Sequence, residues 1–241
     1  MATEQNVHIG VLSPATPNRP HFKSLDAILP AGVSVAHEGL GLLGESYQDL
    51  VGKTDRVIEL AKSFVMRHDV RGLMVTGGFV TLFNPGLEMK VAEATGLPVV
   101  TAVSSAVAAL NAFDAKSVLL MTPFDAVSDG VIKTHLHSLG FSVSLGPSFE
   151  NRKAGSVVNL GSTELFNLVE TTYRVGAAAD AIYFQGATMD PLPIIQQLET
   201  ELTVPVITSN SAMIWNLLSK LGLKYSVQGY GKLLLQWPAP E

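Results

Sequence analysis

The most informative absence in this 241-residue chain is cysteine, which does not occur at all. A chain without thiols forms no disulfide and no thiolate zinc site. It also cannot use cysteine as a nucleophile, or as the acid or base of a proton transfer. Any catalysis must therefore come from other side chains or from the backbone.

Charge and long apolar runs are also scarce. Only 15% of the residues are charged, the net charge is −5, and Lys and Arg do not cluster. This argues against nucleic acid or an anionic membrane as a partner. No apolar run approaches the ~18 residues needed to span a bilayer, and residues 1–10 lack the apolar segment of a signal peptide. We expect a cytoplasmic protein whose 47% hydrophobic residues bury a large core.

What the chain does contain is an apolar stretch followed by a glycine turn, GLMVTGGFVTLF at residues 72–83. The run Leu73-Met74-Val75 predicts a strand buried on both faces. In the turn Thr76-Gly77-Gly78 that follows, backbone N–H groups can bind an anionic oxygen of a carboxylate or an enolate. A tight turn can also need glycine for its conformation alone, and this stretch by itself leaves both interpretations open.

Buried strands and helices alternate along the whole chain. Strands are predicted at residues 7–13, 33–36, 73–75 and 99–102, and again at 117–122, 141–145, 181–185 and the beginning of 204–214. Helices are predicted at residues 46–68, 85–95, 104–113, 126–139 and 162–175. This alternation is typical of parallel sheets with right-handed crossovers.

The second part of the chain repeats the plan of the first. LPVVTAVSSAV at 97–107 and VPVITSNSAMI at 204–214 share Pro, Val, Thr and Ser at matching steps. The pairs Pro14/Pro123, Val75/Gly186 and Pro98/Pro205 each lie about 110 residues apart. We therefore predict an α/β fold with two pseudo-symmetric, Rossmann-like halves, residues 1–115 plus 222–241 and residues 116–221. Chance similarity between βα units is the competing explanation.

In such a fold, the carboxyl ends of both sheets face one cleft, where open α/β sheets bind ligands. Small polar residues and glycines follow the predicted strands, and the proline-rich loop 14–20 holds others at the same edge. The predicted substrate-binding residues are Thr16, Asn18, Val75, Gly77, Gly78, Thr122, Phe124, Gly186, Ala187 and Ser211.

Five motifs, in this order, resemble the aspartate/glutamate/hydantoin racemase superfamily, and within it the branch of arylmalonate decarboxylase and maleate isomerase. They are GLGL at 39–42, LMVTGG at 73–78, ATGLP at 94–98, the stretch from Ser209-Asn210-Ser211 to Trp215, and GYGKL at 229–233. The resemblance implies two pseudo-symmetric halves with the active site between them and no organic cofactor. It also implies a carbanion or enolate beside a carboxylate, held by small polar side chains and backbone amides.

The chain departs from this family at the residues that move protons. The resemblance places one cysteine at the end of the third strand and a second at the matching point of the other half, where this chain has Val75 and Gly186. A tyrosine of the decarboxylases and isomerases is replaced by Phe124. Racemization by two cysteines is excluded, as is thiol-dependent decarboxylation or isomerization.

Another acid or base must then be found, and histidine is the first side chain to consider. His37 and Glu38 follow a predicted strand on the cleft side, with Glu45 and Asp190 as further carboxylates. We predict His37, Glu38, Thr76 and Thr188 as catalytic residues. A solvated loop histidine is the alternative. If His21 joins His37 and Glu38, the three offer a ligand set for Zn²⁺, although no HxxxH or HExxH spacing supports it.

These features favour a cofactor-independent lyase or isomerase that acts on a small aryl or ring carboxylate through an enolate-like intermediate. Its apolar pocket wall is predicted to comprise Leu40, Leu43, Phe79, Phe124 and Met189. One alternative is a hydrolase or desulfhydrase acting on a hydantoin-like ring, with or without a metal ion. The other is a carboxylate-binding protein without catalysis. The predicted partner is a small-molecule carboxylate, and the sequence leaves homo-oligomerisation open.

Overall fold

Two four-stranded parallel sheets form the framework of the computed structural model, which describes residues 6–15, 22–149, 159–176, 179–186 and 188–240. The first sheet has the order β2-β1-β3-β4 and the second the order β6-β5-β7-β8. Every described strand pair is parallel. The first sheet contains β1 (Val7–Ser13), β2 (Val33–Gly39), β3 (Leu73–Val75) and β4 (Val99–Thr101), and the second contains β5 (Ser117–Met121), β6 (Ser142–Leu145), β7 (Ala181–Phe184) and β8 (Val206–Thr208). The predicted α/β fold with two parallel-sheet halves is confirmed.

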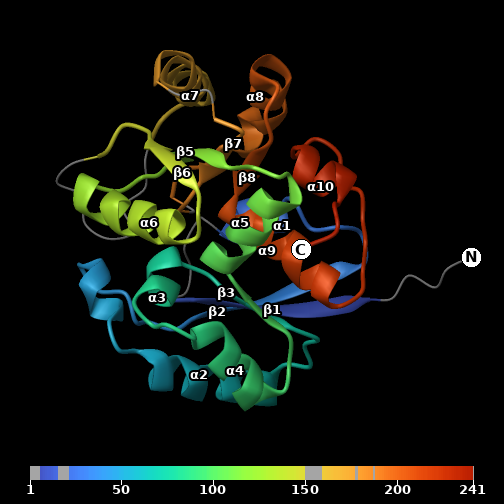
Figure 1. Cartoon of the computed structure of the whole chain (residues 1–241). Coiled ribbons are helices and arrows are strands. Elements are labelled where there is room, and N and C mark those ends of the chain that lie inside the picture. The colour runs from blue at the N-terminus through green and yellow to red at the C-terminus, as the bar shows by residue number, and fades with distance from the viewer. Residues whose placement is uncertain (1–5, 16–21, 150–158, 177–178, 187, 241) are drawn as a thin grey trace, which may run out of the picture.

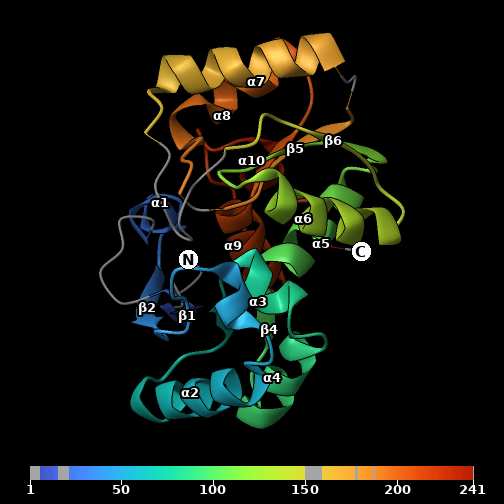
Figure 2. The same cartoon turned by 90° about the vertical axis from the view of Figure 1, so that its left-hand side faces the viewer.

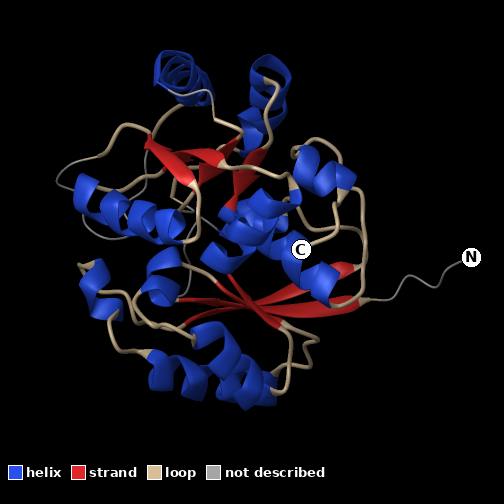
Figure 3. Cartoon of the chain, viewed as in Figure 1, coloured by secondary structure: helices blue, strands red, loops and turns tan. Residues whose placement is uncertain are grey.

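Helices cover the sheets on both faces (Figure 3). In the first half they are α1 (Phe22–Asp26), the 3-10 helix η1 (Tyr47–Leu50), α2 (Thr54–Arg67), α3 (Gly78–Leu82), α4 (Leu87–Thr95) and α5 (Ala102–Ala112). The remaining helices are α6 (Ala126–Ser138), α7 (Ser162–Gly176), η2 (Leu192–Ile194), α8 (Ile195–Leu202), α9 (Ser209–Lys220) and α10 (Lys232–Gln236). None of the described helices is both long and apolar enough to cross a membrane.

The two sheets are stacked with helices between them. Figure 1 shows α5 and α9 between the sheets, with α2 and α4 outside the first sheet and α7 and α8 outside the second. The perpendicular view in Figure 2 shows the same outer layers. Helices α5 and α9 pack against each other, and Asn216 donates a hydrogen bond of 3.2 Å to the Ser105 hydroxyl. The boundaries assigned to the two halves stay a prediction. Helix α10, which the sequence analysis assigned to the first half, packs against α9 and β8.

The repeated Thr-x-x-Ser sequences begin α5 and α9. Thr101 and Thr208 are the N-cap residues, and each side chain accepts a hydrogen bond from the backbone N–H of Ser104 or Ser211. Both serines complete a capping box with their own side chains. Capping residues satisfy the unpaired backbone N–H groups of a helix start. The similarity between 97–107 and 204–214 therefore reflects identical helix starts.

Two sequence predictions differ from the structure. The single helix expected at 46–68 is divided into η1 and α2, because Gly52 adopts a positive φ of 66° between them. The pairing of Val75 with Gly186 is shifted: β4 pairs Val75 with Thr101, whereas β8 pairs Phe184 with Thr208. Val75 thus corresponds to Phe184, and the next residues, Thr76 and Gln185, correspond to each other. The spacing between Pro14 and Pro123 also relates Leu12 to Met121 and Val75 to Phe184, so the offset is constant up to β7 and changes only in the shorter crossover from β7 to β8.

Candidate active site

A cavity of about 100 Å³ lies where the carboxyl ends of both sheets meet. Its polar lining comprises Ser13, Tyr47, Thr76, Gln185, Thr188, Ser209 and Asn210. The other lining residues are Pro14, Ala15, Leu25, Leu43, Leu50, Gly77, Gly78, Phe79, Ala102, Phe124, Gly186 and Met213. The structure therefore brings the predicted residues Thr76 and Thr188 together in one cavity. Their catalytic roles stay predictions.

Gly77 and Gly186 take equivalent places in the two halves. Their φ angles are +83° and +113°, which side chains other than glycine rarely adopt. A Cβ atom on Gly77 would lie 2.7 Å from Pro14 Cγ, and one on Gly186 would lie 2.8 Å from Pro123 Cδ. Each glycine thus lets a strand-end turn fold against the proline that follows β1 or β5. Pro14 and Pro123, which the sequence analysis paired, are thus the contact partners of these two glycines.

Unused hydrogen-bond donors face the cavity. The side chains of Thr76, Thr188 and Asn210 make no hydrogen bond to any described residue, and neither does Nε2 of Gln185. The N–H groups of Gly77 and Gly78 also form no backbone hydrogen bond within the described ranges. Lining donors without a protein acceptor are suited to a ligand with several acceptor oxygens.

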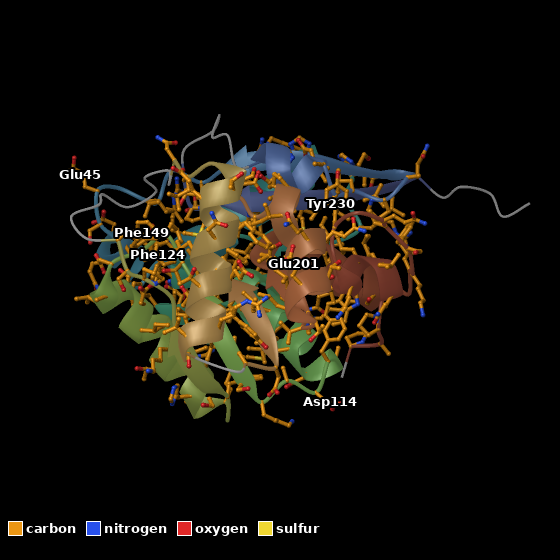
Figure 4. All side chains as sticks on the ribbon, turned by 90° about the horizontal axis from the view of Figure 1, so that it is seen from above. Glu45, Asp114, Phe124, Phe149, Glu201 and Tyr230 are labelled. Atoms are coloured by element: carbon orange, nitrogen blue, oxygen red, sulfur yellow. The ribbon has the colours of Figure 1, made fainter. Side chains whose placement is uncertain are left out.

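An aromatic cluster forms the apolar wall. The Tyr47 ring centroid lies 4.4 Å from that of Phe79 and 5.2 Å from that of Phe124, and the two Phe rings are 5.1 Å apart. The backbone N–H of Phe149 donates to the Phe124 carbonyl at 2.7 Å, and Figure 4 shows these two residues close together. Leu43 also lines the wall, as predicted from the sequence.

Two members of the predicted wall lie elsewhere. Leu40 is buried but does not line this cavity, and Met189 lines a smaller adjoining pocket with Gly186, Ser209 and Asn210. Leu40 directly follows the edge strand β2, and Met189 follows the turn after β7.

The predicted proton-transfer residues His37 and Glu38 lie on the edge strand β2 and outside the described lining. His37 Nε2 is 2.8 Å from the Asp26 carboxylate. Glu38 forms a two-pronged ion pair with Arg67, at 2.9 and 2.7 Å. These contacts give no support to proton transfer in the cavity. Glu45 is exposed and Asp190 lines the smaller pocket only.

Three predicted substrate-binding residues are engaged within the protein. Val75 is fully buried in β3, and Ser211 caps α9. The Thr122 hydroxyl accepts from the Phe124 N–H at 3.1 Å and donates to the buried Asp129 carboxylate. None of the three lines the cavity. Thr16, Asn18, His21 and Ala187 lie outside the described residues.

Asp129 joins α6 to the end of the second sheet. Its other carboxylate oxygen accepts from Ser148 at 2.7 Å. Burial raises the pKa of Asp129, although the hydrogen bonds from Thr122 and Ser148 oppose this rise. The group therefore holds the turn after β5, which carries Phe124 into the cavity wall.

The sequence prediction did not select Ser13, Tyr47, Gln185, Ser209 and Asn210 as site residues, although all five line the cavity. Gln185 had a usable signal, since it directly follows a buried strand as Thr76 does. Tyr47 had none, because the predicted helix at 46–68 assigned it no particular face. No group of three or more His, Asp or Glu side chains with a metal-binding arrangement occurs among the residues that the structure describes.

Comparisons with known proteins match most of the chain to one family. The family model described as arylmalonate decarboxylase matches residues 10–234. The maleate isomerase of Geobacillus stearothermophilus is 23% identical over 139 residues, which are 57% of this chain and 54% of that protein. The maleate isomerase of Nocardia farcinica (strain IFM 10152) is 29% identical over 134 residues, which are 53% of this chain and 50% of that protein. Each match thus spans about half the length of the curated relative.

Solved structures share the fold over nearly the full length. The maleate isomerase Iso from Pseudomonas putida S16 has a TM-score of 0.82 and 19% identity, and the match covers 96% of this chain and 99% of that one. A cysteine-to-serine mutant of the Nocardia farcinica maleate cis-trans isomerase, with a covalently bound succinylcysteine intermediate, has a TM-score of 0.82 and 21% identity, with 95% and 98% coverage. At these identities, the similarity shows the fold alone.

Proposed function

Because the chain belongs to the arylmalonate decarboxylase family, we propose that it is a thiol-independent lyase or isomerase acting on a small carboxylate through an enolate-like intermediate. One observation carries the proposal: unused donors from both halves, including Thr76, Thr188 and Asn210, converge on one cavity beside an aromatic wall. An aryl or other ring carboxylate has the matching combination of oxygens and apolar surface.

The donors are suited to charge that develops during the reaction. In an enolate formed next to a carboxylate, negative charge moves onto the carboxylate oxygens. Donors already aimed at those oxygens stabilise the transition state more than the ground state, because they are in place before the charge develops. Thr76 and the N–H groups of Gly77 and Gly78 would hold these oxygens from the first half. Thr188 and Asn210 would reach them from the second.

Decarboxylation fits this chain better than isomerization through a covalent adduct. The Nocardia farcinica isomerase structure contains a succinylcysteine intermediate, and a chain without cysteine cannot form one. Decarboxylation of a malonate needs no nucleophile. The electron pair of the breaking C–C bond moves into the remaining carboxylate, which gives CO₂ and an enediolate. The leaving carboxylate would lie against Tyr47, Phe79 and Phe124, where poor solvation disfavours its charged form.

The enediolate carbon then needs one proton to give the monocarboxylate product. Tyr47 is our candidate donor, because a phenol is more acidic than the alcohols and amides of the other described lining residues. It lies in the wall against which the leaving carboxylate would be placed. His37 and Glu38 lie outside that lining.

The test is turnover of phenylmalonate in D₂O, followed by NMR. We expect CO₂ release and phenylacetate with one deuterium at the α-carbon, since the proton comes from an exchangeable group. Maleate, assayed in parallel, should not isomerise by way of a covalent adduct. His37→Gln is the matched control and should turn over phenylmalonate as the native protein does. Loss of activity in this control would shift the chemistry to β2 and contradict the proposed site.

A carboxylate-binding protein without catalysis is the second candidate. It is favoured by one observation: the described lining contains no His, Asp, Glu, Lys or Arg. Calorimetric binding of phenylmalonate or maleate, without product formation over days, would identify this candidate and reject the lyase.

A further inference from the structure

Gln185 is a buried polar residue of the cavity for which the sequence predicts no role. It directly follows β7, is only 2% exposed and lines the cavity. Its backbone N–H donates to the Met121 carbonyl at 2.9 Å, as Thr76 N–H donates to the Leu12 carbonyl at 2.9 Å. Gln185 is therefore the counterpart of Thr76 in the second half of the chain.

Two hydroxyl groups surround its side-chain oxygen. The Tyr183 hydroxyl donates to Gln185 Oε1, and the Ser209 hydroxyl lies 3.3 Å from the same oxygen. Tyr183 is fully buried, and burial raises the pKa of its phenol well above the ordinary value of 10.0. The phenol therefore keeps its proton and remains a donor to Oε1 at any ordinary pH.

The orientation of the amide follows from these contacts. Turning the amide by 180° would replace the acceptor Oε1 with an NH₂ group that faces the Tyr183 and Ser209 hydroxyls. The buried phenol would then face a donor and would keep only the longer contact of 3.3 Å to the Ser209 hydroxyl. The observed orientation leaves Nε2 on the cavity side, where it has no acceptor among the described residues.

Nε2 also approaches the anion turn of the first half. A Cβ atom added to Gly78 would overlap with Gln185 Nε2 and lie 2.9 Å from its Cδ. Gly78 does not have a positive φ, so its backbone would accept alanine. The close approach of the amide therefore explains why residue 78 has no side chain. Thr76, Gly77 and Gln185 line the same cavity, and Gln185 Nε2 lies beside the turn that contains the other two.

We propose that Gln185 Nε2 binds the substrate carboxylate from the second half, and that Tyr183 is the positioning residue that prevents Oε1 from facing the anion. The inference rests on the proposed function and adds to it a residue that selects for negatively charged ligands. A carbonyl oxygen in place of Nε2 would repel a carboxylate, so the fixed orientation matters as much as the donor.

The experiment measures affinity rather than turnover, with maleate and phenylmalonate as the probes. Gln185→Met keeps the length of the side chain and removes both polar atoms. We expect its Kd by calorimetry to rise about tenfold to a hundredfold, the typical loss of a hydrogen bond to a charged group. Gln185→Glu should bind more weakly still, because it places a negative charge beside the ligand.

Gly78→Ala tests the same amide from the opposite side. The new methyl group must displace Nε2, so the affinity should fall as in Gln185→Met. Gly130→Ala is the matched control, because its Cβ would meet no atom within 4 Å and it lies in α6, outside the described lining. This control should bind both probes with native affinity. Circular dichroism verifies the fold of each variant.

Tyr183→Phe tests the positioning role by NMR. The side-chain amide signals of Gln185 are identified by their loss in Gln185→Met. Maleate should shift them in the native protein, whereas in Tyr183→Phe they should broaden and shift less, because the amide turns. Equal shifts in both proteins would overturn the role of Tyr183.

The outcomes separate the inference from the function on which it rests. If the native protein binds a probe and Gln185→Met binds it equally well, Gln185 is not a ligand-binding residue, and the proposed function stands. If the native protein binds neither probe, the proposed function fails and the inference fails with it.

Discussion

Among single residues, Thr76 tests the site most directly. Its side chain lines the cavity and makes no hydrogen bond to a described residue, so its replacement disturbs no internal network. Thr76→Val keeps the shape and removes the donor. We expect kcat/KM for phenylmalonate to fall about a hundredfold, the usual effect of losing one donor to a developing oxyanion. Thr76→Ser should retain most activity. An unchanged kcat/KM in Thr76→Val would mean that this hydroxyl does not contact the reacting carboxylate.

Tyr47 should affect the chemical step and not binding. Tyr47→Phe keeps the ring that packs on Phe79 and Phe124 but removes the acidic proton. We expect kcat to fall while the Kd for maleate stays within about twofold, because a positioned proton donor typically contributes at least a hundredfold. Tyr225→Phe, whose ring packs on Trp237, is the control and should behave as the native protein. A parallel loss of affinity in Tyr47→Phe would assign the hydroxyl to binding.

The sequence predicts the residues of the site unevenly, for physical reasons. Thr76, Gly77 and Gly186 could be found because a strand end followed by glycine has few alternative roles. Thr122 and Ser211 are also small polar residues near strand ends. However, the Thr122 side chain bonds Asp129, and the Ser211 side chain forms part of the capping box of α9. A local pattern identifies a polar residue near a strand end, but it does not show whether the side chain is used by a neighbouring residue or is left for a ligand.

At the level of elements, β5, α6 and β6 are joined by the buried Asp129. Its raised pKa means that the folded state binds a proton more tightly than the unfolded state. The contribution of this bound proton to the free energy of unfolding is fully present below the pKa of Asp129 in the unfolded state, near 3.8. It is lost as the pH rises through the pKa of Asp129 in the folded state.

Asp129→Asn should remove this pH dependence. Asparagine keeps an acceptor for Thr122, and the Ser148 hydroxyl can turn to accept from the new NH₂ group. Urea unfolding at several pH values from 4 to 7 provides the measurement. We expect the stability of the native protein, relative to Asp129→Asn, to decrease as the pH rises. If the stability of the native protein relative to Asp129→Asn instead increases with pH, the folded protein favours the charged carboxylate.

Elements are predicted best where burial is complete. The strands β3, β4, β7 and β8 consist wholly of buried residues, and their apolar runs made them visible in the sequence. The division between η1 and α2 was missed, since the apolar spacing continues across Val51 and Gly52. The extended backbone of Val51 and the left-handed conformation of Gly52 separate the two helices, and sequence spacing does not report either.

At the level of the whole molecule, the two halves share one core and one site. Buried residues of both sheets belong to a single hydrophobic cluster. Between the sheets, Asn216 on α9 contacts Ser105 on α5. Lys220 at the end of α9 also pairs at 2.9 Å with Glu88 on α4, a helix of the first half. The cavity also needs strand ends from both sheets. Neither half therefore has a complete core or a complete site alone.

This arrangement predicts that the protein unfolds in one cooperative transition, in spite of its two sheets. Differential scanning calorimetry should give equal calorimetric and van't Hoff enthalpies. Saturating maleate should raise the single midpoint without splitting it, because a ligand that contacts both halves stabilises them together. Asn216→Ala removes a contact between α5 and α9 and should lower the midpoint, again without splitting it. Two transitions, with maleate shifting only one of them, would show that the halves fold independently and that the ligand binds to one sheet alone.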